Sequence, residues 1–232
     1  MATLPKSFVL AQVPSTSEHK AFEFHRTFAS RDPHIHPRTE SEMKEFAQSG
    51  QLLGVRRGDT NGFVGLCYVV HDSAESAWQL GGLTVTMPRM GIGKLLVRFA
   101  LAHTIVVYGE LLQEGRWVRK IIAYVHKENK APRGLLKDLR FQHSGEIVFS
   151  LEGAPSWMKQ NAQRMRQSAK GSVAFEEFTF TSDGLRELAT WFYERFDGTL
   201  HSRRAEAEID LGPISLEEFK EDLRELAATL ES

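Results

Sequence analysis

Apolar and polar residues alternate along several short stretches of the chain, a spacing of two that is typical of strands with one buried face. The strands predicted in this way are Ser7–Val13, Gln51–Arg57, Gly62–His71, Ala77–Thr86, the more continuously apolar Lys120–Val125, and one near Glu146–Leu151. Elsewhere apolar residues recur every three or four positions, as on one face of a helix. The predicted helices are Ser15–Ala29, Thr39–Ser49, a segment that ends near Tyr108, and Ala131–Leu139.

The order of these elements predicts how the strands pair. Three consecutive strands precede a helix and a buried strand, so antiparallel neighbours should give way to a parallel crossover. Asp59-Thr60-Asn61-Gly62 is a strong hairpin signal between the first two of the three. Gly81-Gly82 interrupts the third, which indicates a bulge or the close approach of another backbone. We expect an α/β fold with a mixed sheet.

The stretch Leu83–Ala100 joins a strand, a short loop and a helix. Gly91 and Gly93 allow the backbone to come close to a ligand, and the first N–H groups of a helix suit a phosphate. Arg89 and Lys94 add positive charge. A P-loop is excluded because Pro88 and Leu95 stand where it needs glycine and a hydroxyl, and Leu96 is too large for a dinucleotide fingerprint. The alternative is a turn that only permits tight packing.

The last third of the chain reads as an addition to this sheet. Residues 155–170 are predicted to form a basic helix, inserted before the next strand. That strand, Ser172–Thr181, would complete the sheet as its last member. After it, apolar residues at helical spacing and a capping box at Ser215 and Glu218 indicate helices. We therefore predict a domain over 1–181 and a mostly helical extension over 182–232. The apolar stripe of the last helix would pack on its own core or pair with a second copy in a homodimer.

Composition narrows the function classes. Of 232 residues, 41% are hydrophobic and 25% are charged, and the formal net charge is −1, so general attraction to nucleic acid or anionic membranes is not expected. The single cysteine, Cys67, excludes an internal disulfide and a thiolate metal cluster. Ser7–Val13 is too short and mixed for a signal peptide, and no apolar run reaches membrane-spanning length. We expect a cytoplasmic protein.

His34 and His36 lie between two prolines. Such a pair can bind zinc, but the sequence shows no third ligand nearby. We expect no metal here, and a loop that borders a pocket.

Two separated segments resemble the GNAT superfamily of acyl-CoA-dependent N-acetyltransferases. Leu83–Lys94 resembles the strand, pyrophosphate loop and helix start of that family, and the segment from Tyr124 to Phe141 resembles its next strand and helix. There the family often reads Asn-x-x-Ala-x-x-Leu-Tyr-x-x-x-Gly-Phe, which Asn129, Leu135 and Phe141 match. The resemblance implies a GNAT-like fold, and it does not extend beyond about Thr181.

The resemblance implies acetyl-CoA as acyl donor and a primary amine as acceptor. The cofactor-binding residues that it implies are Leu83, Thr84 and Val85 along the pantetheine, Arg89, Met90, Gly91, Ile92, Gly93 and Lys94 around the pyrophosphate, Asn129 on the pantetheine, and Arg133 near the adenosine 3′-phosphate. The strand should part from Ile122–Val125 to admit the thioester, and its N–H groups should stabilise the oxyanion. For Asn129, an Asx turn that caps the next helix is an equal alternative.

The chain departs from the family at residues that carry chemistry. Pro88 stands at a usual Gln or Arg, Pro132 at an alanine, Arg140 at the late glycine, and Leu136 at the tyrosine that protonates the leaving thiolate.

An amine of pKa about 10.4 is neutral only about once in 2,500 molecules at pH 7, so a base is needed. The strand before the loop offers Gln79 instead of the usual Glu, which leaves His126 or Tyr124 as catalytic residues, with Tyr108 and Glu110 weaker options. A histidine side chain can act as a base near neutral pH, so His126 suits this role, and a partly exposed strand-end histidine is the alternative.

Three functions stay open at this point: an N-acetyltransferase that works by direct attack, a module that binds acyl-CoA without transferring the acyl group, and an acetyltransferase of aminoacyl-tRNA. The near-neutral charge argues against the last.

Overall fold

The computed structural model describes residues 6–72, 76–108, 111–113, 116–117, 119–152, 156, 159–160, 171–201, 206–212 and 215–230. The basic helix predicted over 155–170 and Glu110 fall largely or wholly outside these residues. Within them, no helix is long and apolar enough to span a bilayer.

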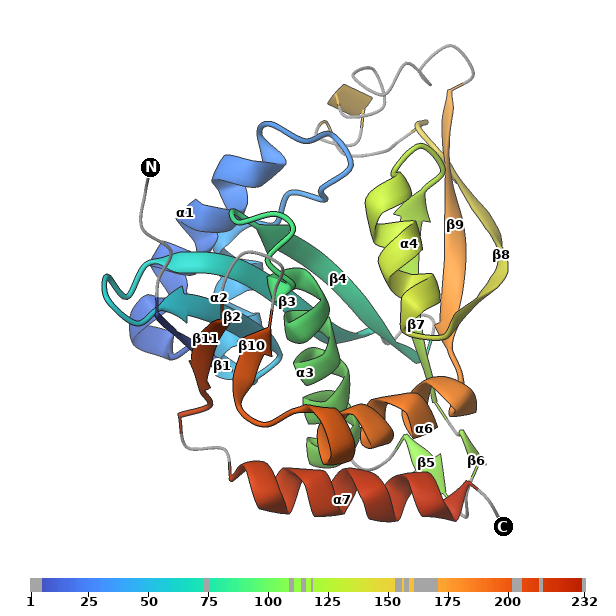
Figure 1. Ribbon diagram of the computed structural model, residues 1–232. Helices are drawn as coiled ribbons and strands as arrows, with labels where there is room; N and C mark the ends of the chain where they lie inside the picture. Colours follow the sequence, from blue (N-terminus) through green and yellow to red (C-terminus); the bar gives the residue numbers. More distant parts are fainter. Residues whose placement is uncertain are drawn as a thin grey trace.

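A nine-stranded mixed sheet forms the centre of the molecule (Figure 1), with the strand order β10-β11-β1-β2-β3-β4-β7-β9-β8. The strands are β1 (Ser7–Gln12), β2 (Leu52–Arg57), β3 (Phe63–Asp72), β4 (Ala77–Val85), β7 (Lys120–His126), β8 (Phe141–Ser150), β9 (Ser172–Phe180), β10 (Thr199–His201) and β11 (Glu206–Asp210). Two short strands, β5 (Leu112–Gln113) and β6 (Arg116–Trp117), pair separately. The β1–β11 and β4–β7 pairs are parallel and the others are antiparallel. The α/β fold with a mixed sheet and a parallel crossover is confirmed.

Helices cover both faces of the sheet. They are α1 (Glu18–Ala29) after the 3₁₀ turn η1 (Ser15–Ser17), α2 (Glu40–Gln48), α3 (Ile92–Val107), α4 (Lys130–Asp138), α6 (Ser182–Thr190), the π-helical turn η3 (Trp191–Arg195) and α7 (Leu216–Thr229). One core joins α3, α4, α6 and α7 to the sheet, and a second lies under α1 and α2 around Met43 and Tyr68. The two cores lie on opposite faces because β3 alternates its side chains between them.

Two strand predictions need correction. β8 starts directly at Phe141, well before the expected Glu146, because the chain turns through Arg140 in a left-handed conformation (φ 61°) straight into the strand. β9 does not lie at the edge of the sheet: it is inserted between β7 and β8 and pairs with both.

The C-terminal segment is part of the same sheet and core. β11 pairs with β1, and β10 pairs with β11, so residues after 181 extend the sheet at its far side. Phe99 on α3 contacts Phe192, Phe196 and Phe219 at ring-centroid distances of 4.8, 5.3 and 5.9 Å. The apolar stripe of α7 packs on its own chain, as its buried Phe219 and Leu223 show.

Candidate functional site

β4 and β7 pair only at their first residues and then part (Figure 1). Their ladder runs from Ala77↔Lys120 to Gln79↔Ile122 and stops there. Against β3, two residues of β4, Gly82 and Leu83, stand opposite the single residue between Leu66 and Tyr68. This is a β-bulge, which bends a strand away from its neighbour. The bulge predicted from the double glycine is confirmed, and the strands form a V.

Only glycine fits at the bulge. A Cβ on Gly81 would lie 2.6 Å from the Tyr68 ring, and one on Gly82 would lie 2.0 Å from it. Gly82 also has a positive φ of 61°, which strains other residues. The Tyr68 ring therefore packs directly against the β4 backbone where the V opens.

The loop after β4 presents a helix N-terminus beside the V. Arg89 and Gly91 have left-handed φ angles of 64° and 82°. The α3 ladder begins with Leu95 N–H donating to the Gly91 carbonyl at 3.0 Å, so the N–H groups before it have no i−4 partner. A Cβ on Gly93 would lie 3.5 Å from Val85 Cγ2 and 3.9 Å from Leu83 Cδ2, so this first turn faces the diverging part of β4.

Two of the three cations expected at the phosphates hold ion pairs with other elements. Lys94 Nζ lies 3.1 Å from Asp138 Oδ2, which joins the start of α3 to the end of α4. Arg133 Nε lies 2.6 Å from Glu176 Oε2 on β9, and its Nη1 donates to the Lys127 carbonyl at 3.2 Å. Arg89 is exposed.

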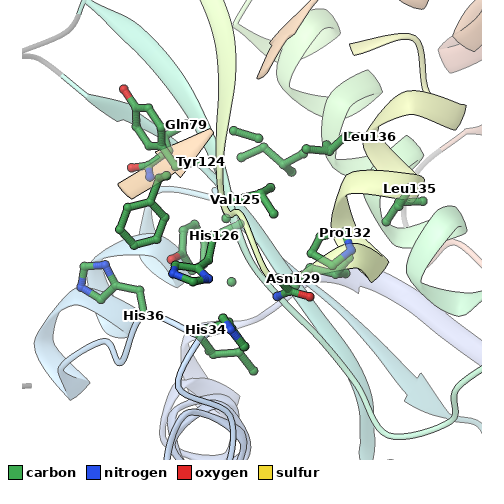
Figure 2. Close-up of a pocket in the computed structure, with 18 of the residues that line it drawn as sticks. His34, His36, Gln79, Tyr124, Val125, His126, Asn129, Pro132, Leu135 and Leu136 are labelled. Atoms are coloured by element: carbon green, nitrogen blue, oxygen red, sulfur yellow. The ribbon is translucent and has the colours of Figure 1, made fainter. Parts of the chain in front are cut away.

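Asn129 is the residue before α4, but its side chain makes no capping hydrogen bond. The alternative that it serves as an Asx cap is therefore wrong. Its own N–H donates to the His126 carbonyl at 2.9 Å, and its side chain lines the cavity described next (Figure 2).

A cavity of about 380 Å³ occupies the V. β4 contributes Gln79 to Leu83, β7 contributes Ala123 to His126, and α4 contributes Leu135 and Leu136. The loop between α1 and α2 closes one end with Pro33 to His36. Figure 2 shows α4 residues on one side and His36, Gln79 and Tyr124 on the other. The expectation that this loop borders a pocket is confirmed.

Four contacts fix the α1–α2 loop and the start of α2. Arg38 donates from Nε to the Tyr68 hydroxyl at 3.0 Å and from Nη1 to Glu42 at 2.9 Å. His25 Nε2 lies 2.9 Å from the His36 carbonyl, and burial lowers the pKa of His25. Thr39 and Glu42 form a capping box that starts α2. The loop is thus held to Tyr68 of β3, whose ring packs against the bulge of β4.

The histidines predicted as separate features lie side by side. His126, at the end of β7, is 2% exposed, and its ring centroid is 5.0 Å from that of His34 (Figure 2). Its Nδ1 accepts a hydrogen bond from Glu128 N–H at 3.3 Å. His34 Nδ1 lies 2.9 Å from Asp32 Oδ1. Sequence reasoning missed Asp32, whose only local signal is its position two residues before the histidine.

The other candidate residues differ in whether they reach the cavity. Tyr124 is half-buried in the cavity wall, and Leu136, 3% exposed, provides no phenol there. Tyr108 donates to the Ser49 carbonyl at 2.7 Å and is outside the cavity lining. Burial raises the pKa of the Cys67 thiol, so Cys67 is no thiolate nucleophile.

No family model and no curated protein sequence matches this chain. Solved structures do. An acetyltransferase of the GNAT family from Streptococcus pneumoniae matches with a TM-score of 0.52 at 13% identity, over 75% of this chain and 98% of its own. The ribosomal-protein-S5-alanine acetyltransferase from Vibrio fischeri matches with a TM-score of 0.52 at 12% identity, over 77% and 95%. A spermidine N-acetyltransferase chimera from Vibrio cholerae gives 0.51 at 12%, over 77% and 98%.

These likenesses show that the chain has the fold of GNAT acetyltransferases. At this identity they establish the fold alone. The two named acceptors, a ribosomal-protein alanine and spermidine, differ in kind, so the acceptor of this chain must be argued from its own residues.

Proposed function

We propose that this protein is an acyl-CoA-dependent N-acyltransferase that transfers acetyl from acetyl-CoA to a primary amine by direct attack. The observation that carries the proposal is the V between β4 and β7, with a glycine-containing helix N-terminus on one side and a cavity of about 380 Å³ within it. An extended pantetheine chain needs an open strand edge, and a pyrophosphate needs unpaired N–H groups.

The residues present fit this cofactor. The first turn of α3, from Gly91 to Lys94, would hold the pyrophosphate, and Leu83 to Val85 would offer the pantetheine an unpaired strand edge. Asn129 fits as a further contact because its side chain lines the cavity without capping α4. Arg133 would need to exchange Glu176 for the adenosine 3′-phosphate.

The same geometry supports the chemistry of acyl transfer. Backbone N–H groups of β4 beside the bulge would stabilise the oxyanion that develops on the thioester carbonyl. We assign His126 as the base that takes the proton from the attacking amine, with Tyr124, on the same face of β7, as a second catalytic residue. The amine nitrogen forms the new bond to the acyl carbon while the carbon–sulfur bond breaks. Because Leu136 has no acidic proton to donate, the leaving thiolate would be protonated from solvent.

The test is transfer of label from radiolabelled acetyl-CoA to pooled amines, peptides and charged tRNA, with acetyl-CoA binding measured in parallel by calorimetry. We expect binding, and label on an amine or peptide. Binding without any transfer would make the protein an acyl-CoA-binding module, label on tRNA would place it with aminoacyl-tRNA acetyltransferases, and absence of binding would reject the proposal. A cytoplasmic location and a homodimer stay predictions.

A further inference from the structure

Three side chains of types that can ligate metals lie close together where the α1–α2 loop meets the end of β7, and two of them, His34 and His126, line the cavity. His34 comes from the α1–α2 loop, and His126 and Glu128 come from the end of β7 and the turn after it. One ligand atom from each residue lies within 4.8 Å of the other two. Residue spacing could not predict this group, because His34 stands some ninety positions before its partners.

His34 has the arrangement of a metal ligand. Its Nδ1 lies 2.9 Å from Asp32 Oδ1, and the same carboxylate oxygen accepts the His34 backbone N–H at 2.9 Å. The carboxylate therefore holds the proton on Nδ1 and leaves a lone pair on Nε2. Nε2 is buried and has no hydrogen-bond partner among the residues that the structure describes. Metal-bound histidines in proteins almost always donate their other ring N–H to a carboxylate, a backbone carbonyl or water.

His126 and Glu128 complete the group. The Nε2 atom of His126 is buried, and its Nδ1 receives the Glu128 N–H at 3.3 Å, long for a hydrogen bond. Coordination through Nε2 would move the His126 proton to Nδ1. Nδ1 could then no longer accept the Glu128 N–H, so binding would cost only this long hydrogen bond. Glu128 is exposed on the turn, so its side chain can rotate to bring its carboxylate closer to the two imidazoles. A metal 2.0–2.2 Å from each ligand needs ligand atoms about 3 to 3.5 Å apart.

We propose that His34, His126 and Glu128 bind one divalent transition-metal ion, with Zn²⁺ as the best match. Two imidazoles and one carboxylate, with a water or acceptor atom as fourth ligand, form a common zinc set. Mg²⁺ and Ca²⁺ prefer oxygen ligands and do not suit it. With Nε2 on the ion and the proton on Nδ1, His126 would have no lone pair left for the amine proton that the proposed function assigns to it. Metal binding itself does not depend on that function, whereas its effect on catalysis does.

Binding is tested on the full chain, freed of any purification tag and of metal by EDTA, by titration with Co²⁺ and Zn²⁺. We expect one ion per chain, a visible absorption band from bound Co²⁺, and its loss when Zn²⁺ is added. His34→Gln and Glu128→Gln should each abolish the band, and Asp32→Asn should weaken binding by about 10- to 100-fold. His36→Gln is the matched control, because His36 lines the same cavity from the same loop but is not in the group.

Absence of saturable binding up to about 1 mM metal would overturn the proposal. So would binding that persists in both His34→Gln and Glu128→Gln, or binding that His36→Gln removes equally. If His34→Gln fails to fold by circular dichroism, Glu128→Gln decides alone, because Glu128 is exposed and holds no ion pair within the described part of the chain. Because the readout is metal binding, failure here leaves the acyltransferase proposal intact, and failure of acyl transfer leaves this one intact.

Discussion

Replacing Gly93 by alanine separates the role of the α3 N-terminus in folding from its role in binding. The added Cβ would meet Val85 Cγ2 at 3.5 Å and Leu83 Cδ2 at 3.9 Å, both ordinary contacts, and Gly93 has no positive φ. Within a helix, glycine to alanine stabilises by about 0.5–1 kcal/mol. For a chain of this size, that raises the Tm by about 1–4 °C.

The same methyl group should weaken acetyl-CoA binding. It lies on the turn where the pyrophosphate is proposed to approach the backbone, and a hydrogen bond to a charged group contributes about 1.5–3 kcal/mol. Loss of one such bond lowers affinity by about 10- to 150-fold. The Gly93→Ala variant should therefore melt higher and bind acetyl-CoA more weakly, measured by thermal unfolding without ligand and by calorimetry.

Gly145→Ala is the matched control, because a Cβ there meets nothing within 4 Å and β8 is separated from α3 by other strands. It should leave acetyl-CoA affinity unchanged. If Gly93→Ala folds normally and binds acetyl-CoA as tightly as the native protein, the first turn of α3 does not hold the pyrophosphate, and the reasoning is refuted.

Three further predictions concern the histidines. His126→Ala should lower acyl-transfer turnover in EDTA while acetyl-CoA affinity stays nearly unchanged, and unchanged turnover would remove His126 from the mechanism. Zn²⁺ should inhibit acyl transfer reversibly, and His34→Gln should remain active but lose this inhibition; equal inhibition of both proteins would place the ion elsewhere. Burial lowers the pKa values of His25 and His103 below the usual 6.5, so the stability that they contribute is complete above 6.5 and declines as pH falls below it. Urea unfolding at about pH 7.5 and about pH 5.5 should show a smaller loss in His103→Gln than in the native protein, and equal losses would contradict this role.

The backbone features around the V were largely predictable because their signals are local. The loop glycines, the start of α3 and the Gly81-Gly82 bulge each depend on backbone geometry over a few residues, and the structure bears out the bulge and the V. Lys94 and Arg133 were expected to face phosphate, yet they pair with Asp138 and Glu176. Those partners come from other elements, which residue spacing cannot reveal.

The C-terminal strand β11 shows that a pattern can be present in the sequence and still not be sufficient to predict a strand. Buried Ala207 and Ile209 alternate with exposed Glu206, Glu208 and Asp210 in β11, a period-two signal that was present in the sequence. The segment is only five residues long and lies between helical stripes, so its pairing with β1 depends on a neighbour from the opposite end of the chain.

By itself, the sequence determined the succession of the longer strands and helices as far as β9, the bulge and the glycine turn, because side-chain periodicity and backbone conformation are local properties. Only the tertiary structure decided that His34, His126 and Glu128 meet, that Asp32 orients His34, and that the α1–α2 loop closes the V. Those contacts arise because the splayed strands leave room that a distant loop fills. Arg38, at the end of that loop, donates to the Tyr68 hydroxyl and lies over its ring, and spacing along the chain cannot show this contact because it joins two elements that are 30 positions apart.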